Sequence, residues 1–194
     1  ARTALGVRLA GLIFACAFGS EAAMARQGVP AAANAGLYDL LVGNYTAGKS
    51  HGIYVYRFDA SNGHMKPLSS VQTVNPSYLV ATRDHRHVYA VNELPGDNGP
   101  ATERGGISAF AFDPSSGTLS FVNRVSSEGN DPCYLSFSPD ERYLLTANYS
   151  VAANPGGSFA VFPLRASGAL GDAVLVVHNE GGGPVKGRQD NAHV

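Results

Sequence analysis

The sequence has little charge of either sign, and this shortage excludes several classes of protein. Its 194 residues carry 14 Lys and Arg against 15 Asp and Glu, a formal net charge of −1. No basic stripe indicates a nucleic-acid surface, and no polybasic patch indicates a membrane surface. The composition is that of one soluble globular domain or part of a larger one, with no nucleic-acid partner expected.

Long hydrophobic runs are also missing, apart from a short one near the N-terminus. The stretch "LAGLIFACAFG" follows two Arg and precedes "AMA", with small residues at Ala23 and Ala25. It is too short to span a bilayer, and the order of charge, apolar run and small residues is typical of a secretory signal peptide. We expect a signal peptide over residues 1–25, a linker over 26–36 and a periplasmic or secreted protein without membrane attachment after cleavage. A buried core helix is the alternative.

Cysteine is scarce, since only Cys133 remains if the segment containing Cys16 is removed. One thiol can form neither an internal disulfide nor a structural zinc site. The sequence has no H-E-x-x-H pair and no G-x-S-x-G nucleophile elbow. We therefore expect no metal and no other cofactor.

What the sequence does contain is a repeat. The segments 75–94 and 131–150 align without gaps at an offset of 56 (131 − 75), with identical Pro, Tyr, Leu, Asp, Arg and Asn. The segments "GIYVYRFD", "GISAFAFD" and "GSFAVFPL" also match, and each precedes a turn with Gly. A unit of about fifty residues built from strand-length pieces predicts an all-β protein, a β-propeller with one blade per repeat.

Each repeat reads as four strands. The second unit, for example, has strands at 77–82, 87–92, 106–112 and 118–126, and the first unit, from Leu37, starts at its second strand. About three blades of an expected seven are then present in residues 37–194. We expect the remaining blades to be missing from this sequence, because propellers close only with about four to eight blades.

One motif suggests a different protein. "GNYTAGKS", residues 43–50, fits the phosphate-loop pattern G-x-x-x-x-G-K-[ST]. Such a loop needs a helix after its Lys-Ser, but the following "HGIYVYRFD" alternates like a strand. The repeat places the motif in the loop between the second and third strands. We interpret the match as a coincidence and expect no ATP binding.

The combined strings resemble one family. "LLVGNYTAGKSHGIYVYRFD", "VYAVNEL", "GGISAFAFDPSSGTLSF", "DPCYLSFSPDERYLLTANYS" and "RQDNAHV" are similar to the seven-bladed propeller lactonases, whose best-known members are bacterial 6-phosphogluconolactonases. The resemblance covers about residues 37–194. It implies a hydrolase that opens 6-phosphoglucono-lactone to 6-phosphogluconate, with a small sugar lactone as its partner.

His193 is the candidate catalytic residue. The repeat aligns "NAHV" with "NPSY" and "DPCY", which places His193 where Ser77 and Cys133 stand, at the start of the innermost strand. Such a position borders the central channel, where a small polar ligand can bind. In the family that the sequence resembles, a His in this context is a proposed catalytic residue, and the resemblance carries this role over to His193. A channel-lining or structural His is the alternative.

Four further residues are candidate substrate ligands. Asn44, Asn92 and Asn148 recur at the end of the second strand and should open on the same face as His193. A structural role as loop caps is the alternative for them, since Asn amides commonly bond to backbone in turns. Arg188 could meet a substrate anion, but could also be a solvated loop residue.

The predicted export and the resemblance disagree about the substrate, because the family's phosphosugar is cytosolic. An unphosphorylated sugar lactone would resolve the disagreement. The alternative function is a non-catalytic propeller that binds a polymer or a protein at the cell surface.

Overall fold

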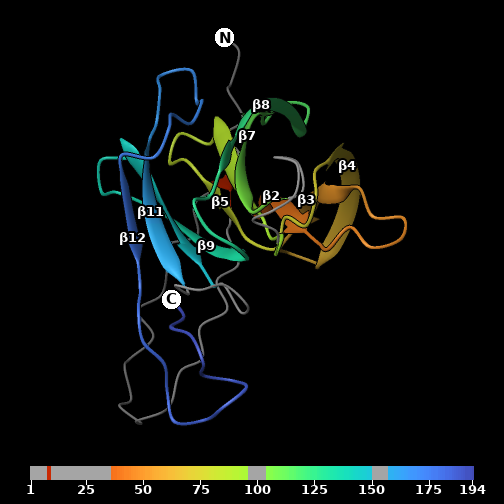
Figure 1. Ribbon diagram of the computed structural model, residues 1–194. Helices are drawn as coiled ribbons and strands as arrows, with labels where there is room; N and C mark the ends of the chain where they lie inside the picture. The colour runs from red at the N-terminus through yellow and green to blue at the C-terminus, as the bar shows by residue number, and fades with distance from the viewer. Residues whose placement is uncertain (1–7, 10–35, 96–103, 150–156) are drawn as a thin grey trace, which may run out of the picture.

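The computed structural model describes residues 8–9, 36–95, 104–149 and 157–194, and it contains three four-stranded sheets (Figure 1). The strands of the first sheet are β1 (Arg8–Leu9), β2 (Leu37–Gly43), β3 (Gly52–Asp59) and β4 (His64–Gln72). Those of the second are β5 (Leu79–Ala81), β6 (His87–Asn92), β7 (Gly106–Asp113) and β8 (Thr118–Ser126). Those of the third are β9 (Pro132–Phe137), β10 (Tyr143–Asn148), β11 (Ser158–Pro163) and β12 (Leu175–His178).

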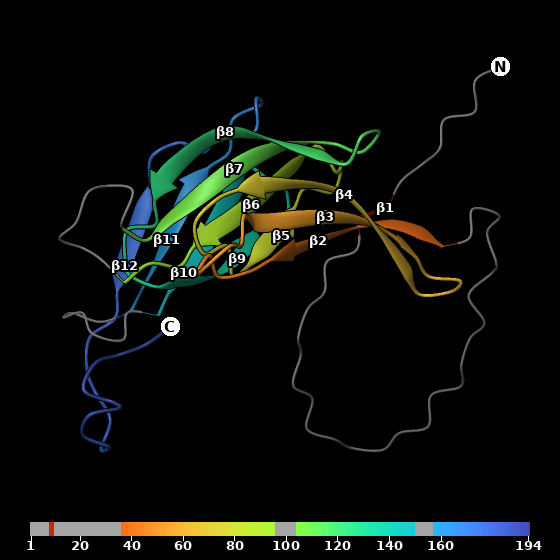
Figure 2. The same cartoon turned by 90° about the vertical axis from the view of Figure 1, so that its right-hand side faces the viewer.

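The sheets repeat the same topology. Strands β5 to β8 and β9 to β12 are each paired in sequence order, and every pair within these two sheets is antiparallel. The first sheet differs at its edge, where Arg8–Leu9 pairs parallel to β2. The predicted all-β architecture and the four-stranded unit are therefore confirmed. Figure 2 shows the sheets from the side, with β8 on the outside and β9 and β5 deeper in the molecule.

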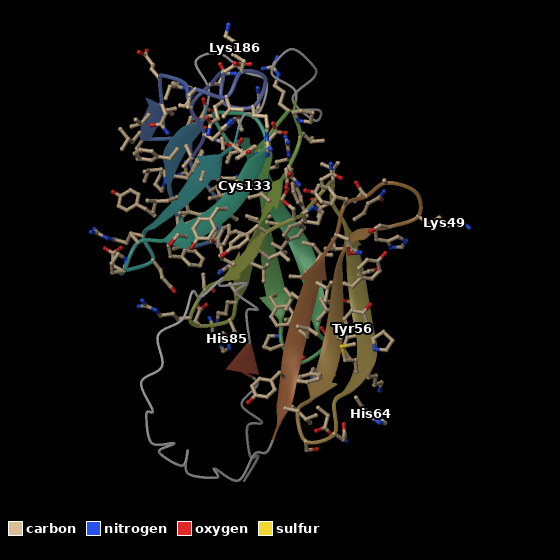
Figure 3. All side chains as sticks on the ribbon, turned by 90° about the horizontal axis from the view of Figure 1, so that it is seen from below. Lys49, Tyr56, His64, His85, Cys133 and Lys186 are labelled. Atoms are coloured by element: carbon tan, nitrogen blue, oxygen red, sulfur yellow. The ribbon has the colours of Figure 1, made fainter. Side chains whose placement is uncertain are left out.

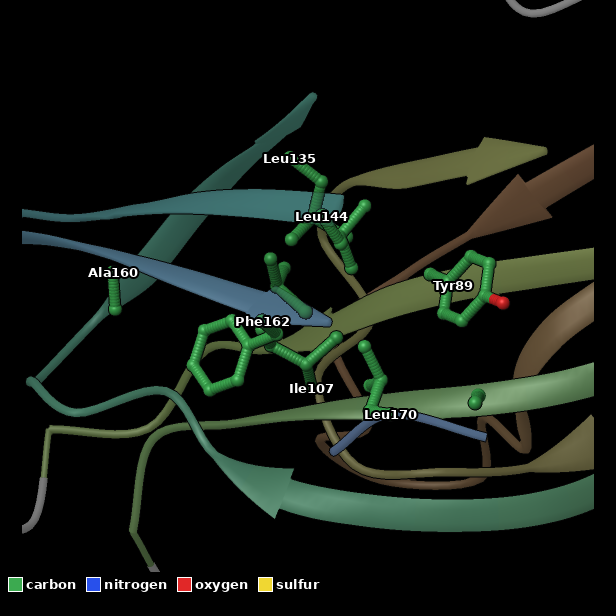
Figure 4. Close-up of a cluster of buried hydrophobic side chains, with 9 residues drawn as sticks. Tyr89, Ile107, Leu135, Leu144, Ala160, Phe162 and Leu170 are labelled. Atoms are coloured by element: carbon green, nitrogen blue, oxygen red, sulfur yellow. The ribbon is translucent and has the colours of Figure 1, made fainter. Parts of the chain in front are cut away.

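The second sheet is buried on both faces, since it packs against the first sheet on one side and the third on the other. Successive side chains of each strand point to opposite faces and so enter different clusters. Val88 and Ala90 of β6 pack toward the first sheet, among Ile53 and Val55. Tyr89 of the same strand packs toward the third sheet in the cluster drawn in Figure 4. This cluster joins the second and third sheets, and its members are Tyr89, Val91, Ile107, Ala109, Leu135, Leu144, Ala160, Phe162 and Leu170. The near-continuous apolar run of β6 follows from this double burial.

The glycine turns between the last two strands have the predicted backbone. Gly63, Gly117 and Gly168 have φ of 77°, 72° and 80°, in the left-handed region that favours glycine. In the first two turns a leading aspartate accepts hydrogen bonds from serine. The bonds to Ser61 lower the pKa of Asp59, and those to Ser115 and Ser116 lower the pKa of Asp113.

The phosphate-loop motif has a strand after it. β3 begins at Gly52, so the helix that a phosphate loop requires does not follow Lys49. Apart from Arg8 and Leu9, the predicted signal peptide lies outside the described residues, as does the linker up to residue 35, and both stay predictions. None of the described segments forms a helix of the length and hydropathy needed to cross a membrane.

Candidate functional site

The inner strands line a groove of about 700 Å³ that runs between the two ends of the sheets. Its wall includes Leu41 of β2, Val80 of β5 and Phe137 of β9. Tyr78 and Tyr134, which are equivalent in the repeat, meet across two adjacent sheets with ring centroids 4.8 Å apart. The starts of the inner strands therefore do come together, as the repeat predicts.

Ser77, at one end of this groove, belongs to a set of residues that interact with one another. We call this set the site rim, and hydrogen bonds, ring stacking or charge link its members: Tyr45, Ser77, Glu93, Cys133, Tyr149 and His193. In Figure 3 Cys133 lies toward the end of the molecule that carries Lys49 and Lys186, whereas His85 lies toward the other end. The loop between β2 and β3, which contains Lys49, therefore lies toward the end that holds Cys133.

Glu93 collects two hydroxyl groups on its carboxylate. The Tyr45 hydroxyl donates to Oε1 at 2.8 Å, and the Ser77 hydroxyl donates to Oε2. The hydrogen bond to Glu93, followed by burial, raises the pKa of Tyr45. A half-buried carboxylate in this position can accept hydrogen bonds from a polyhydroxylated ligand, because each carboxylate oxygen has two lone pairs.

Cys133 lies next to this carboxylate. Its Sγ is 3.8 Å from the carbonyl oxygen of Ala147. Burial, and then the negative charges of Glu93 and Asp131, raise the pKa of the thiol. Cys133 is thus held in its protonated form, which is a poor nucleophile.

His193 makes two contacts with Tyr149. Its Nδ1 lies 2.9 Å from the Tyr149 carbonyl oxygen, and its ring stacks on the Tyr149 ring with centroids 4.4 Å apart and planes at 12°. A carbonyl oxygen can only accept, so Nδ1 carries the proton. In the neutral ring Nε2 then holds the free lone pair and can take a proton from water.

The asparagine series does not behave as one set. Asn44 is exposed, and its amide is 3.5 Å from the Ser50 hydroxyl. Asn92 is fully buried, donates to the Val74 carbonyl at 2.7 Å and accepts from the Ser108 hydroxyl at 2.8 Å.

Asn148 is also fully buried, and it donates to the Ser127 carbonyl at 2.8 Å and to the Ser158 hydroxyl at 3.0 Å. These contacts turn Asn92 and Asn148 into the sheet junctions instead of toward the groove. For these two residues the geometry favours the structural alternative over substrate binding.

Arg188 lies in the segment that follows β12 and extends away from the sheets (Figures 1 and 2). It is exposed, and its backbone N–H donates to the Val185 carbonyl at 3.2 Å. Within residues 157–194, no hydrogen bond or ion pair joins Arg188 to His193. Its part in substrate binding stays a prediction.

No three His, Cys, Asp or Glu side chains in the described part of the chain are grouped so that they could hold a metal ion.

Sequence reasoning gave too little weight to two rim residues. Glu93 stands where the other repeats have Tyr45 and Tyr149, and this departure from the pattern was its signal. Tyr149 had a signal as well, since Asn-Tyr recurs at 44–45 and 148–149. Its stacking on His193 joins residues 44 positions apart, and the repeat alone does not reveal it.

Comparison with known proteins identifies the family and supports the fold. The family model described as "Lactonase, 7-bladed beta-propeller" matches residues 39–194. The chain belongs to this lactonase family. The predicted β-propeller is thereby confirmed, and the three sheets are blades of a partial propeller.

Three similar proteins illustrate the extent of the match. The chain is 31% identical over 153 residues to the 6-phosphogluconolactonase of Bacillus subtilis, covering 78% of this chain and 40% of the relative. It is similar to a putative 6-phosphogluconolactonase structure from Bacteroides fragilis, with 42% identity, a TM-score of 0.72 and coverage of 85% and 42% of the two chains. It is also similar to the periplasmic gluconolactonase of Pseudomonas aeruginosa, with 45% identity, a TM-score of 0.73 and coverage of 81% and 43%. The chain thus spans about two fifths of the length of these lactonases.

Proposed function

We propose that the full-length protein hydrolyses a sugar lactone at the site rim, with His193 as the general base. The observation that carries this proposal is the 2.9 Å contact between His193 Nδ1 and the Tyr149 carbonyl, which leaves Nε2 as the basic nitrogen. The names of the 6-phosphogluconolactonase and gluconolactonase relatives support the choice of a lactone.

The reaction follows from this arrangement. Nε2 removes a proton from a water molecule as the water oxygen attacks the lactone carbonyl carbon, and a tetrahedral oxyanion forms. The oxyanion collapses and the ring C–O bond breaks. The imidazolium returns its proton to the leaving ring oxygen, and the product is the open hydroxy acid. Water and lactone are consumed in equal amounts, and no redox step occurs.

The test compares lactone opening by the full-length protein and by its His193→Gln variant, followed as acid release above the spontaneous rate. Loss of a general base lowers kcat by about 10²–10⁴-fold. His178→Ala is the matched control, because His178 is an exposed histidine at the end of the outer strand β12. It should retain the wild-type kcat. If the wild-type protein opens the lactone only at the spontaneous rate, the proposed hydrolase activity is contradicted. The alternative function, a non-catalytic propeller that binds a polymer or a protein, would then be favoured.

We also propose that the protein acts after export, on an unphosphorylated lactone. The support is the predicted signal peptide together with the periplasmic location named for the Pseudomonas aeruginosa relative. Glucono-lactone and 6-phosphoglucono-lactone should be compared side by side. A larger kcat/KM for the phosphorylated lactone, or a cytosolic protein on cell fractionation, would contradict this proposal.

A further inference from the structure

The backbone on either side of His193 is fixed, in addition to its ring. The Gly157 N–H donates to the carbonyl of Ala192 at 2.7 Å. A Cβ at Gly157 would come within 2.8 Å of the Val194 nitrogen and 3.0 Å of the His193 carbonyl carbon. Glycine at this position therefore lets the segment containing His193 lie directly on the start of the third blade's third strand.

Tyr149 is in turn fixed by the third blade. Its N–H donates to the Asp131 carbonyl at 3.0 Å, at the start of the inner strand β9. The preceding residue, Asn148, is buried and tied to Ser127 and Ser158. The carbonyl group that accepts from His193 consequently belongs to a rigid part of the sheet junction.

The ring of Tyr149 makes a second contribution, separate from that of its backbone carbonyl, because it stacks on the imidazole. It is 42% exposed, and one face of it is covered by the imidazole at a nearly parallel 12°. An aromatic face attracts a cation placed over it, so it stabilises an imidazolium more than a neutral imidazole. An imidazolium is the form that His193 takes after it has accepted the proton of water.

We propose that Tyr149 is the positioning residue of His193. Its carbonyl group selects the tautomer with hydrogen on Nδ1, while its ring fixes the plane of the imidazole and stabilises the imidazolium that forms during lactone opening. This inference rests on the proposed function for its kinetic consequence, but the tautomer and the ring orientation exist without substrate. An aromatic ring is required and its hydroxyl group is not.

The experiment uses Tyr149→Phe and Tyr149→Leu in the full-length protein, with Tyr143→Leu as the matched control. Tyr143 is an exposed tyrosine at the opposite end of the same strand, β10. We expect the Phe variant to keep kcat within about twofold. Loss of the cation–π contact in the Leu variant should lower kcat by about 3- to 30-fold, with KM changed much less.

A second readout is independent of activity. NMR of the imidazole nitrogens should show His193 with hydrogen on Nδ1 in the wild type and in Tyr149→Phe. Tyr149→Leu keeps the backbone carbonyl, so hydrogen should stay on Nδ1, but the imidazole should become mobile because the stacked ring is gone. If the wild type opens no lactone, the proposed function fails, yet the nitrogen spectra still decide whether Tyr149 positions His193.

Two results would overturn the inference. One is a Tyr149→Leu variant with wild-type kcat and an unchanged His193 spectrum. The other is a Tyr149→Phe variant as impaired as Tyr149→Leu, because the hydroxyl group and not the ring face would then be needed. Should the Leu variant fail to fold, as judged by circular dichroism, the Phe variant alone decides through its kcat and its spectrum.

Discussion

Glu93 of the second blade accepts a 2.8 Å hydrogen bond from the hydroxyl group of Tyr45 in the first blade. Its other carboxylate oxygen accepts from Ser77. The rim therefore has an acidic centre, and this centre lies close enough to Cys133 for its charge to act on the thiol.

The pH dependence of Cys133 alkylation reports on the negative charge of Glu93. Burial and the carboxylates of Glu93 and Asp131 raise the pKa of Cys133, so the midpoint of its alkylation by iodoacetamide should lie above the usual thiol pKa of about 8.5. Glu93→Gln removes one of these charges and should move the midpoint of the alkylation profile to lower pH. Mass spectrometry of the peptide that contains Cys133 follows this thiol separately from any other. An identical profile in Glu93→Gln would show that the carboxylate does not act on Cys133.

The asparagines offer a matched pair for stability. Asn148→Ala removes two buried hydrogen bonds and leaves the Ser127 carbonyl without its donor, which costs about 1–3 kcal/mol. Asn44→Ala, at the equivalent exposed position, should change the free energy of unfolding by less than about 0.5 kcal/mol. Urea unfolding of the full-length variants gives both values. Equal losses at the two positions would contradict the structural role of Asn148.

These two asparagines also show how much of the structure could be predicted from the sequence. The repeat predicted the second strands residue for residue, at 87–92 and 143–148, because the two segments align without a gap. It left open whether the side chain of Asn148 faces the groove or the scaffold, because alternation separates the two faces of a strand without saying which one packs on the next blade. In the structure Leu144, Thr146 and Asn148 are the buried residues of β10. Asn148 thus lies in the blade junction, although the pairing register shifts between Ala147 and Asn148.

The tie between the second and third blades can be tested through Tyr89. Its hydroxyl group donates to the carbonyl of the buried Gly168 at 2.9 Å, and burial raises the pKa of Tyr89 to about 12. Tyr89→Phe should lower the free energy of unfolding by about 1–3 kcal/mol, because the carbonyl loses its partner. Tyr143→Phe, on an exposed ring, is the control and should be neutral in the same urea titration.

Acid should weaken the turns opposite the rim. A hydrogen bond from Thr82 lowers the pKa of Asp84, and bonds from Ser138 and Arg142 lower the pKa of Asp140. The folded-state pKa of each carboxyl lies below its unfolded value of about 3.9, so its contribution is complete above that pH and is lost as the pH falls through the folded value. Asp84→Asn should therefore destabilise the protein at about pH 7.

The difference between wild type and Asp84→Asn should shrink once the pH is below about 4. Urea midpoints of the two proteins, measured across this range, check the sign. A gap that widens on acidification would mean that the carboxylate is stabilised less in the folded state than in the unfolded chain.

The buried Asn at the end of β6 and β10 is followed by a residue that differs between the blades, Glu93 in one and Tyr149 in the other. The buried amide anchors the scaffold, while its more exposed neighbour in sequence belongs to the site rim. Evolution can thus exchange one amino acid per blade at this position and alter the chemistry of the rim without disturbing the architecture, which gives a duplicated fold a simple route to new substrates.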